Sequence, residues 1–78
     1  MNTLDARGLS CPEPVIMIKK AFDAIKAANS GTIPAGTAFG IMVDNRTSVE
    51  NITRFGEHEG LKVSVSKIQE DFTVRLEK

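Results

Sequence analysis

The chain has 78 residues, of which 41% are hydrophobic, and its ten basic and ten acidic side chains give a formal net charge of zero. This length fits one domain, residues 1–78, with a small core. Both signs of charge are scattered, which excludes the broad electrostatic footprint of a nucleic-acid binder. We therefore expect no direct nucleic-acid binding. No apolar run approaches the roughly 20 residues that span a bilayer, so we also expect no membrane insertion.

The chain contains a single cysteine, Cys11, and a single histidine, His58. One cysteine excludes an internal disulfide framework, and no signal peptide is evident, so we expect a cytoplasmic protein. The two side chains fall short of the four ligands of a structural zinc site, and we expect neither a metal nor a resident cofactor. A dithiol redox cycle would need a second thiol from another protein.

Residues 3–6 predict a short strand, and Gly8 marks the turn after it. Residues 12–28 predict a helix, because apolar side chains recur there at steps of three and four residues. This stripe, which we assign to the core, contains Val15, Ile18, Phe22 and Ile25, with Ala21 beside them.

The start of this helix determines how Cys11 is presented. With Cys11 as N-cap, Pro12 and Pro14 occupy the first and third helical positions, where backbone amides have no partner within the helix. With Ser10 as N-cap and Glu13 completing a capping box, Pro14 would remove the first intrahelical hydrogen bond. The sequence therefore favours Cys11 as the cap.

A cysteine at a helix start is a candidate nucleophile, because the partial positive charge there favours the thiolate. In this register the amides of Cys11 and Glu13 are free donors near the sulfur, while Pro12 and Pro14 stiffen the turn and shield one side of it. The alternative is a buried, inert cysteine that acts as a small hydrophobe.

Residues 29–36 predict a loop, and residues 37–43 predict a strand that is apolar on both faces. Asp44 and Asn45 end this strand. The segment 47–50 has capping-box spacing, which predicts a helix that begins at Thr47 and stops at Gly60. Its apolar side contains Val49, Ile52 and Phe55.

Two segments with alternating hydrophobicity end the chain and predict an antiparallel hairpin with one wet face. The apolar positions are Leu61, Val63 and Val65 in the first segment and Phe72, Val74 and Leu76 in the second. The element order βαβαββ predicts an α+β two-layer sandwich, in which two helices pack on one face of a mixed four-stranded sheet.

If the first two strands are parallel neighbours, their carboxyl ends lie at one edge of the sheet, where binding sites are common. Arg7, Cys11, Asp44 and Asn45 would gather at this edge. Arg7 either steers a reaction partner towards Cys11 or supports its thiolate, or it pairs with a carboxylate of Asp5 or Asp44.

The remaining polar candidates have structural explanations. We expect Asp5 to fix the turn after the first strand, because no second carboxylate is arranged beside it for acid/base work. Glu13 suits the helix dipole, and its negative charge opposes thiolate formation, so we do not make it catalytic. We expect His58 to be a solvated residue at a helix end, far from the favoured edge.

The segment Asp-x-x-Gly-x-x-Cys-Pro-x-Pro, present as Asp5, Gly8, Cys11, Pro12 and Pro14, resembles the TusA/SirA-like sulfur-carrier family. The tetrapeptide Asp-Ala-Arg-Gly at residues 5–8 and the segment 49–55 resemble the YedF-like branch of this family, which is associated with selenium metabolism. The loop at 29–36 is longer than is usual in the family.

This resemblance implies the same two-layer fold and a sulfurtransferase-like carrier. Cys11 would be the catalytic residue and would hold sulfane sulfur as a covalent persulfide, with no other cofactor. The residues that shape the site would be Asp5, Arg7, Gly8, Pro12, Glu13 and Pro14. Sulfur would come from a donor protein, such as a cysteine desulfurase, and pass to an acceptor protein.

Two other functions are compatible with the same residues. The domain could be a non-catalytic module for protein interaction or regulation. It could also be a thiol-redox or selenium-handling protein that uses Cys11 with a partner thiol.

Overall fold

The computed structural model describes residues 2–9 and 13–78. The elements follow the predicted order βαβαββ and are β1 (Asn2–Asp5), α1 (Glu13–Ala28), β2 (Ala38–Val43), α2 (Arg46–His58), β3 (Lys62–Ile68) and β4 (Asp71–Glu77).

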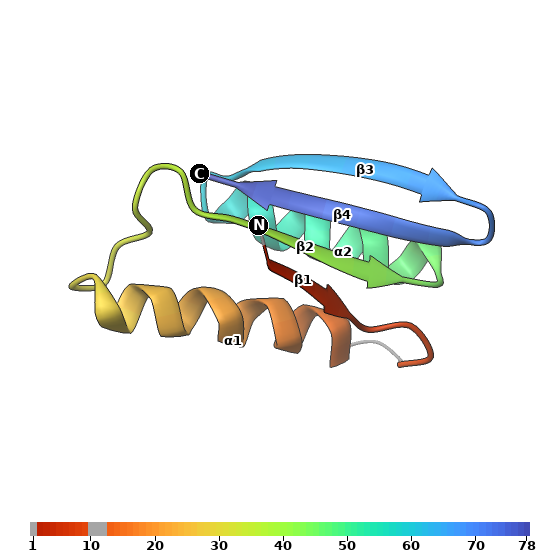
Figure 1. The fold of residues 1–78 in the computed structure, drawn as a ribbon, viewed down its shortest axis with the longest axis horizontal. Helices are drawn as coiled ribbons and strands as arrows, with labels where there is room; N and C mark the ends of the chain where they lie inside the picture. The colour runs from red at the N-terminus through yellow and green to blue at the C-terminus, as the bar shows by residue number, and fades with distance from the viewer. Residues whose placement is uncertain (1, 10–12) are drawn as a thin grey trace.

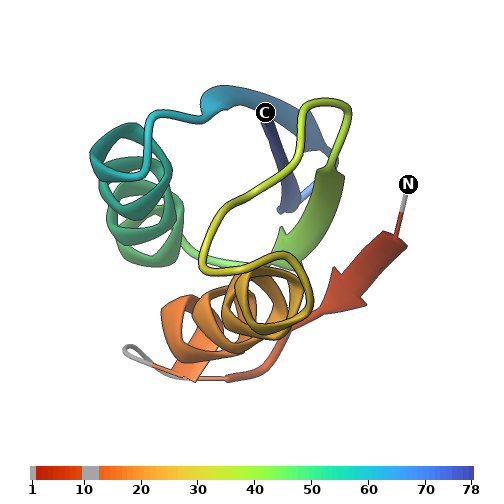
Figure 2. The same cartoon turned by 90° about the vertical axis from the view of Figure 1, so that its left-hand side faces the viewer.

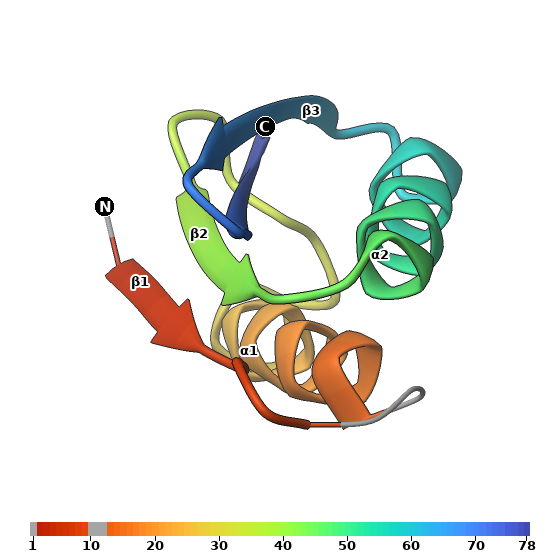
Figure 3. The same cartoon turned by 90° about the vertical axis from the view of Figure 1, so that its right-hand side faces the viewer.

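The four strands form one mixed sheet in the order β1-β2-β4-β3 (Figure 1). β1 runs parallel to β2, while β4 is antiparallel to both β2 and β3. Both helices lie on the same face of the sheet, as the two end-on views show (Figures 2 and 3). The predicted two-layer sandwich is therefore confirmed.

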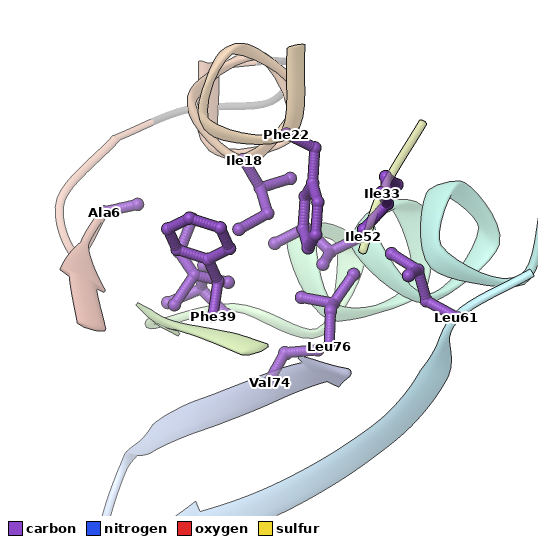
Figure 4. Packing of buried hydrophobic residues seen from close by; sticks show 11 residues of the cluster. Ala6, Ile18, Phe22, Ile33, Phe39, Ile52, Leu61, Val74 and Leu76 are labelled. Atoms are coloured by element: carbon purple, nitrogen blue, oxygen red, sulfur yellow. The ribbon is translucent and has the colours of Figure 1, made fainter. Parts of the chain in front are cut away.

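The core lies between the helices and the sheet (Figure 4). On α1, Ile18 and Phe22 are fully buried. The Phe22 ring packs edge-on against Phe39 of β2, with centroids 5.0 Å apart and an interplanar angle of 72°. The other stripe residues of α1, which are Val15, Ala21 and Ile25, are half-buried against this core. The predicted stripe is thus confirmed as core.

The beginning of α2 differs from the prediction. Its N-cap is Asn45, whose side chain accepts a hydrogen bond of 2.8 Å from the amide of Ser48. The helix begins at Arg46, so Thr47 is already helical and the capping box at 47–50 was wrong. Asn45 is the N-cap because it lies two residues after the end of β2 and still has extended backbone angles, as an N-cap requires.

The end of α2 agrees with the prediction of a glycine C-cap. Regular helix ends at His58, and Gly60 follows with φ of +75°, a conformation that glycine adopts at little cost. The amide of Leu61 donates 2.8 Å to the carbonyl of Gly56, and the amide of Gly60 donates 3.1 Å to Glu57. These are the two hydrogen bonds of a Schellman motif.

The hairpin of β3 and β4 forms as predicted, but β3 is largely outside the core. Val74 and Leu76 of β4 are fully buried, whereas Val65 of β3 is 47% exposed. β3 is an outer strand, and α2 approaches it at Val63, whose side chain lies beside Gly56. Beyond Val63 the alternating pattern continues without a helix to bury it.

The loop predicted at 29–36 lies between α1 and β2 and extends to Thr37, because β2 begins at Ala38. The loop contributes Ile33 to the core, where only 8% of its surface stays exposed. Ser30 has φ of +57°, and the next amide, that of Gly31, donates 2.7 Å to the carbonyl of Lys26. This hydrogen bond corresponds to the one from Leu61 to Gly56 at the end of α2, so the two helices end in the same way.

Neither described helix has the length and hydrophobicity needed to cross a membrane. Within residues 2–9 and 13–78, the structure brings together no group of three or more His, Cys, Asp or Glu side chains that would hold a metal ion.

Candidate functional site at the carboxyl edge of β1 and β2

The carboxyl ends of β1 and β2 meet at one edge of the sheet, because these strands are parallel neighbours. The chain leaves β1 through a turn that is bonded to β2. The amide of Ala6 donates 2.8 Å to the carbonyl of Met42, and the amide of Gly8 donates 2.7 Å to Asp44 Oδ2. Figure 3 shows this turn leading from β1 towards the start of α1. Of the residues predicted to gather at this edge, Arg7 belongs to this turn, Asp44 contacts it and Asn45 contacts Asp44, while Cys11 lies outside the described residues.

Arg7 lies between two carboxylates. Its Nε and Nη2 donate to Asp5 Oδ1 and Oδ2 at 3.0 and 2.9 Å, a bidentate geometry. Its Nη1 donates to Asp71 Oδ2 at 3.3 Å. Of the two carboxylates considered from the sequence, Asp5 is the partner of Arg7, and Asp44 binds Gly8 instead. The second partner, Asp71, was not anticipated.

Asp5 also organises its own turn. Its Oδ1 accepts a hydrogen bond of 3.1 Å from the backbone amide of Arg7, two residues further on. This contact is the one by which an aspartate side chain stabilises a turn. The side chains of Asp5 and Arg7 are about half exposed, at 50% and 46%, so the pair is screened by solvent and acts mainly through its geometry.

These hydrogen bonds shift the pKa values of three side chains at this edge. Arg7, through its side chain and then its amide, lowers the pKa of Asp5 from 3.8 to about 2. The amide of Gly8, followed by the side chain of Asn45, lowers the pKa of Asp44. Asp5 and then Asp71 raise the pKa of Arg7. All three groups are therefore charged near neutral pH.

Asn45 joins the edge through Asp44. Its Nδ2 donates 3.2 Å to Asp44 Oδ1, while its own Oδ1 accepts the amide of Ser48 and caps α2. One side chain thus orients the carboxylate that holds Gly8 and also begins the second helix. His58 is exposed at the opposite end of α2.

Glu13 and Pro14 form the first described turn of α1. Glu13 is exposed at the positive end of the helix, where its charge interacts favourably with the dipole. Pro14 has less than 2% of its surface exposed. It therefore packs into the protein, a role that the sequence did not reveal. Cys11 and Pro12, with their predicted N-cap and first-turn positions, lie outside the described residues.

Asp71 is the site residue that sequence reasoning missed. It stands at the first position of β4, 64 residues from Arg7 in the chain. Its only local signal is the polar run Gln69-Glu70-Asp71, which indicates a turn and gives no information on a distant partner.

These features define a small α+β sandwich with a hydrogen-bonded turn at the carboxyl edge of its parallel strand pair. The fold is similar to that of the crystal structure of a SirA-like protein from Desulfitobacterium hafniense, with a TM-score of 0.83 and 31% identity. That match covers 99% of this chain and 96% of the other.

The sequence comparisons give the family. Residues 2–78 match the family described as sulfurtransferase TusA. The chain is also 31% identical, over 67 residues, to a protein of Methanocaldococcus jannaschii that is named as a candidate sulfur carrier protein. That match covers 86% of this chain and 79% of the relative. The chain belongs to the TusA family.

Proposed function

We propose that this protein is a sulfur carrier that holds sulfane sulfur as a persulfide on Cys11. The observation that carries the proposal is that the TusA family match spans residues 2–78 of a chain with one cysteine, two positions before the first residue of α1. The name of the Methanocaldococcus jannaschii relative supports the same role. One nucleophilic thiol suffices for a carrier.

The transfer proposed here needs no external oxidant or reductant. The Cys11 thiolate attacks the outer sulfur of a persulfide on the donor protein. The sulfur–sulfur bond in the donor breaks, the donor cysteine leaves as a thiolate, and a new sulfur–sulfur bond forms on Cys11. An acceptor thiolate then repeats this exchange on the outer sulfur of Cys11. The number of disulfide-type bonds stays constant in each step.

The surroundings of Cys11 in the sequence suit this role. α1 has 16 residues, and the partial positive charge at its N-terminus favours a thiolate or a persulfide anion. Before Cys11 in the sequence, the amides of Arg7 and Gly8 donate hydrogen bonds to the carboxylates of Asp5 and Asp44, which fix the turn there. We assign site-shaping roles to Asp5, Arg7, Gly8, Pro12, Glu13 and Pro14 for this reason.

The partners that we propose are a sulfur donor, such as a cysteine desulfurase or another sulfurtransferase, and an acceptor protein, in the cytoplasm. The persulfide would be the only covalent group that the protein carries. The resemblance to the YedF-like branch makes selenium an additional cargo to test on the same thiol.

The test is the intact mass of the reduced protein after incubation with a cysteine desulfurase and free cysteine. We expect a gain of one sulfur atom that a reductant removes, and no gain in Cys11→Ser. A known carrier that loads under the same conditions serves as the positive control. If this control loads and the wild-type protein does not, the relay from this donor is refuted. Selective formation of mixed disulfides or selenium adducts would support the redox or selenium alternatives instead.

A further inference from the structure

The strand β3 has one side of its backbone free. It is an outer strand of the sheet, and β4 is the strand that pairs with it within the described residues. Apart from Val63, all of its residues are exposed. The N–H and C=O groups along such an edge are a template for another extended segment.

Partly exposed apolar side chains lie beside this edge, on the side of the sheet that faces the helices. The pairing of Val65 with Val74 and of Lys67 with Phe72 places these residues on the helix side. Val65 is 47% exposed and Phe72 is half-buried. Figure 1 shows that the end of the β3–β4 hairpin projects beyond the first turn of α2.

Two cations flank the Phe72 ring. The guanidinium carbon of Arg46 and Nζ of Lys67 each lie 5.8 Å from its centroid. Within residues 2–9 and 13–78, neither cation forms an ion pair with a carboxylate. Arg46 is also the first residue of α2, where the helix dipole adds positive potential. Beside Phe72, Arg46 and Lys67 therefore present two positive charges that are available to an acidic partner.

We define the β3 edge patch as Arg46, Val65, Lys67 and Phe72 together with the free backbone edge of β3. We propose that this patch docks an extended acidic segment of another protein, which adds to β3 as a further strand. Backbone hydrogen bonds supply the pairing, carboxylates on the incoming segment approach Arg46 and Lys67, and an apolar side chain covers Val65.

Charge argues against a second copy of this chain as the occupant. β3 contains Lys62 and Lys67 and no acidic residue. Two β3 strands side by side would bring together four lysines without a carboxylate, and like charges across strands are destabilising. The same lysines that prevent self-pairing favour an acidic partner strand.

The probe that tests the proposal is a synthetic peptide of three Glu-Val repeats, capped at both ends. We expect saturable binding to the 15N-labelled protein, with a dissociation constant below about 1 mM. The shifted amide resonances should belong to β3 and to the start of α2. A peptide with Lys in place of Glu tests the charge, and one with Pro in place of Val tests the backbone pairing.

Variants locate the site. We expect Lys67→Glu and Arg46→Glu each to weaken binding by about threefold to tenfold, because each reversal replaces an attraction with a repulsion at an exposed site. Lys20→Glu makes the same change of charge on the exposed side of α1 and should leave binding unchanged. Far-ultraviolet circular dichroism verifies that each variant is folded.

Four outcomes would overturn the proposal. These are no shift at about 1 mM peptide, equal binding of the lysine or proline peptide, and self-association of the protein through β3. The fourth is tighter binding of a single-stranded oligouridylate at the same resonances, which would assign the patch to nucleic acid. The binding measurement needs no reactive thiol, so it fails or succeeds separately from sulfur loading on Cys11.

Discussion

Gly56 of α2 lies directly against Val63 of β3. A methyl group built on Gly56 would come within 2.6 Å of Val63 Cγ2 and 2.8 Å of Leu76 Cδ2. These distances are shorter than any that packed carbon atoms adopt. The second helix therefore approaches the sheet at a position that has no side chain.

We expect Gly56→Ala to lower the free energy of unfolding by about 1–3 kcal/mol, the usual cost of overpacking. This loss should appear although alanine is favoured over glycine in a helix by about 1 kcal/mol. Urea denaturation measures it. Adding Val63→Ala makes room for the new methyl group, so the double variant should lose less stability than the sum of the single variants. Additive losses would contradict the contact.

The N-cap of α2 gives a second prediction. Asn45→Ala should cost about 1 kcal/mol, because the amide of Ser48 loses its acceptor. Thr47→Ala is the matched control, since Thr47 is exposed within the first turn of the helix and caps nothing. Thermal unfolding of the two variants should therefore give clearly different midpoints. A larger loss in Thr47→Ala would favour the capping box that the sequence suggested.

The choice between Asn45 and Thr47 as the N-cap of α2 shows what the sequence alone could not predict. The apolar period of α1 and the alternation in β4 predicted their elements well, because burial of one face imposes a period on the sequence. In contrast, Asn45, Thr47 and Ser48 are all good N-cap residues. Local pattern cannot choose among them. The choice depends on where β2 ends in the sheet.

The candidate site likewise has some features that the sequence could predict and others that it could not. Parallel pairing of the first two strands was predictable from the βαβ order, and it brought the Gly8 turn to Asp44. The contact between Arg7 and Asp71 and the burial of Pro14 depend on how distant elements pack. No local pattern carries that information. The exposure of Val65 has the same origin, since it depends on how far α2 extends over β3.

The acidity of Asp5 predicts how stability depends on pH. Its pKa is about 2 in the folded protein and near 3.8 in its ordinary state. A lowered pKa stabilises the folded state above about pH 4, and this contribution is lost as the pH falls from about 4 towards 2. We expect Asp5→Asn to reduce the loss of stability over this range.

Urea denaturation at several pH values between 2 and 6 measures this effect, with Asp23→Asn as control. Asp23 is exposed on α1, outside the Arg7 network. If Asp5→Asn and the wild-type protein lose stability in parallel as the pH falls, the hydrogen bonds from Arg7 do not stabilise the carboxylate in solution.

Pro14 connects stability with the proposed sulfur transfer. Because its side chain is buried, Pro14→Ala should cost about 1–3 kcal/mol, through lost packing and a more flexible unfolded chain. The fold should survive this loss. We also expect slower transfer of sulfur, since the proline ring at position 14 restricts the backbone three positions after Cys11.

A stability control separates the two effects. Ile18→Val, in the core on the same helix, should cost about 0.5–1.5 kcal/mol and leave the transfer rate unchanged. Single-turnover transfer from a loaded desulfurase gives the rates. Wild-type kinetics in Pro14→Ala would count against a role for Pro14 in the transfer.

The position of β4 has a consequence for synthesis on the ribosome. β4 follows the other three strands in sequence, yet it lies between β2 and β3 in the sheet. Until it leaves the exit tunnel, β2 and β3 have no common neighbour and Arg7 lacks Asp71. The nascent domain therefore cannot add its strands to the sheet in the order in which they are synthesised. It completes its sheet, and with it the Arg7 network, only after residues 71–77 have emerged.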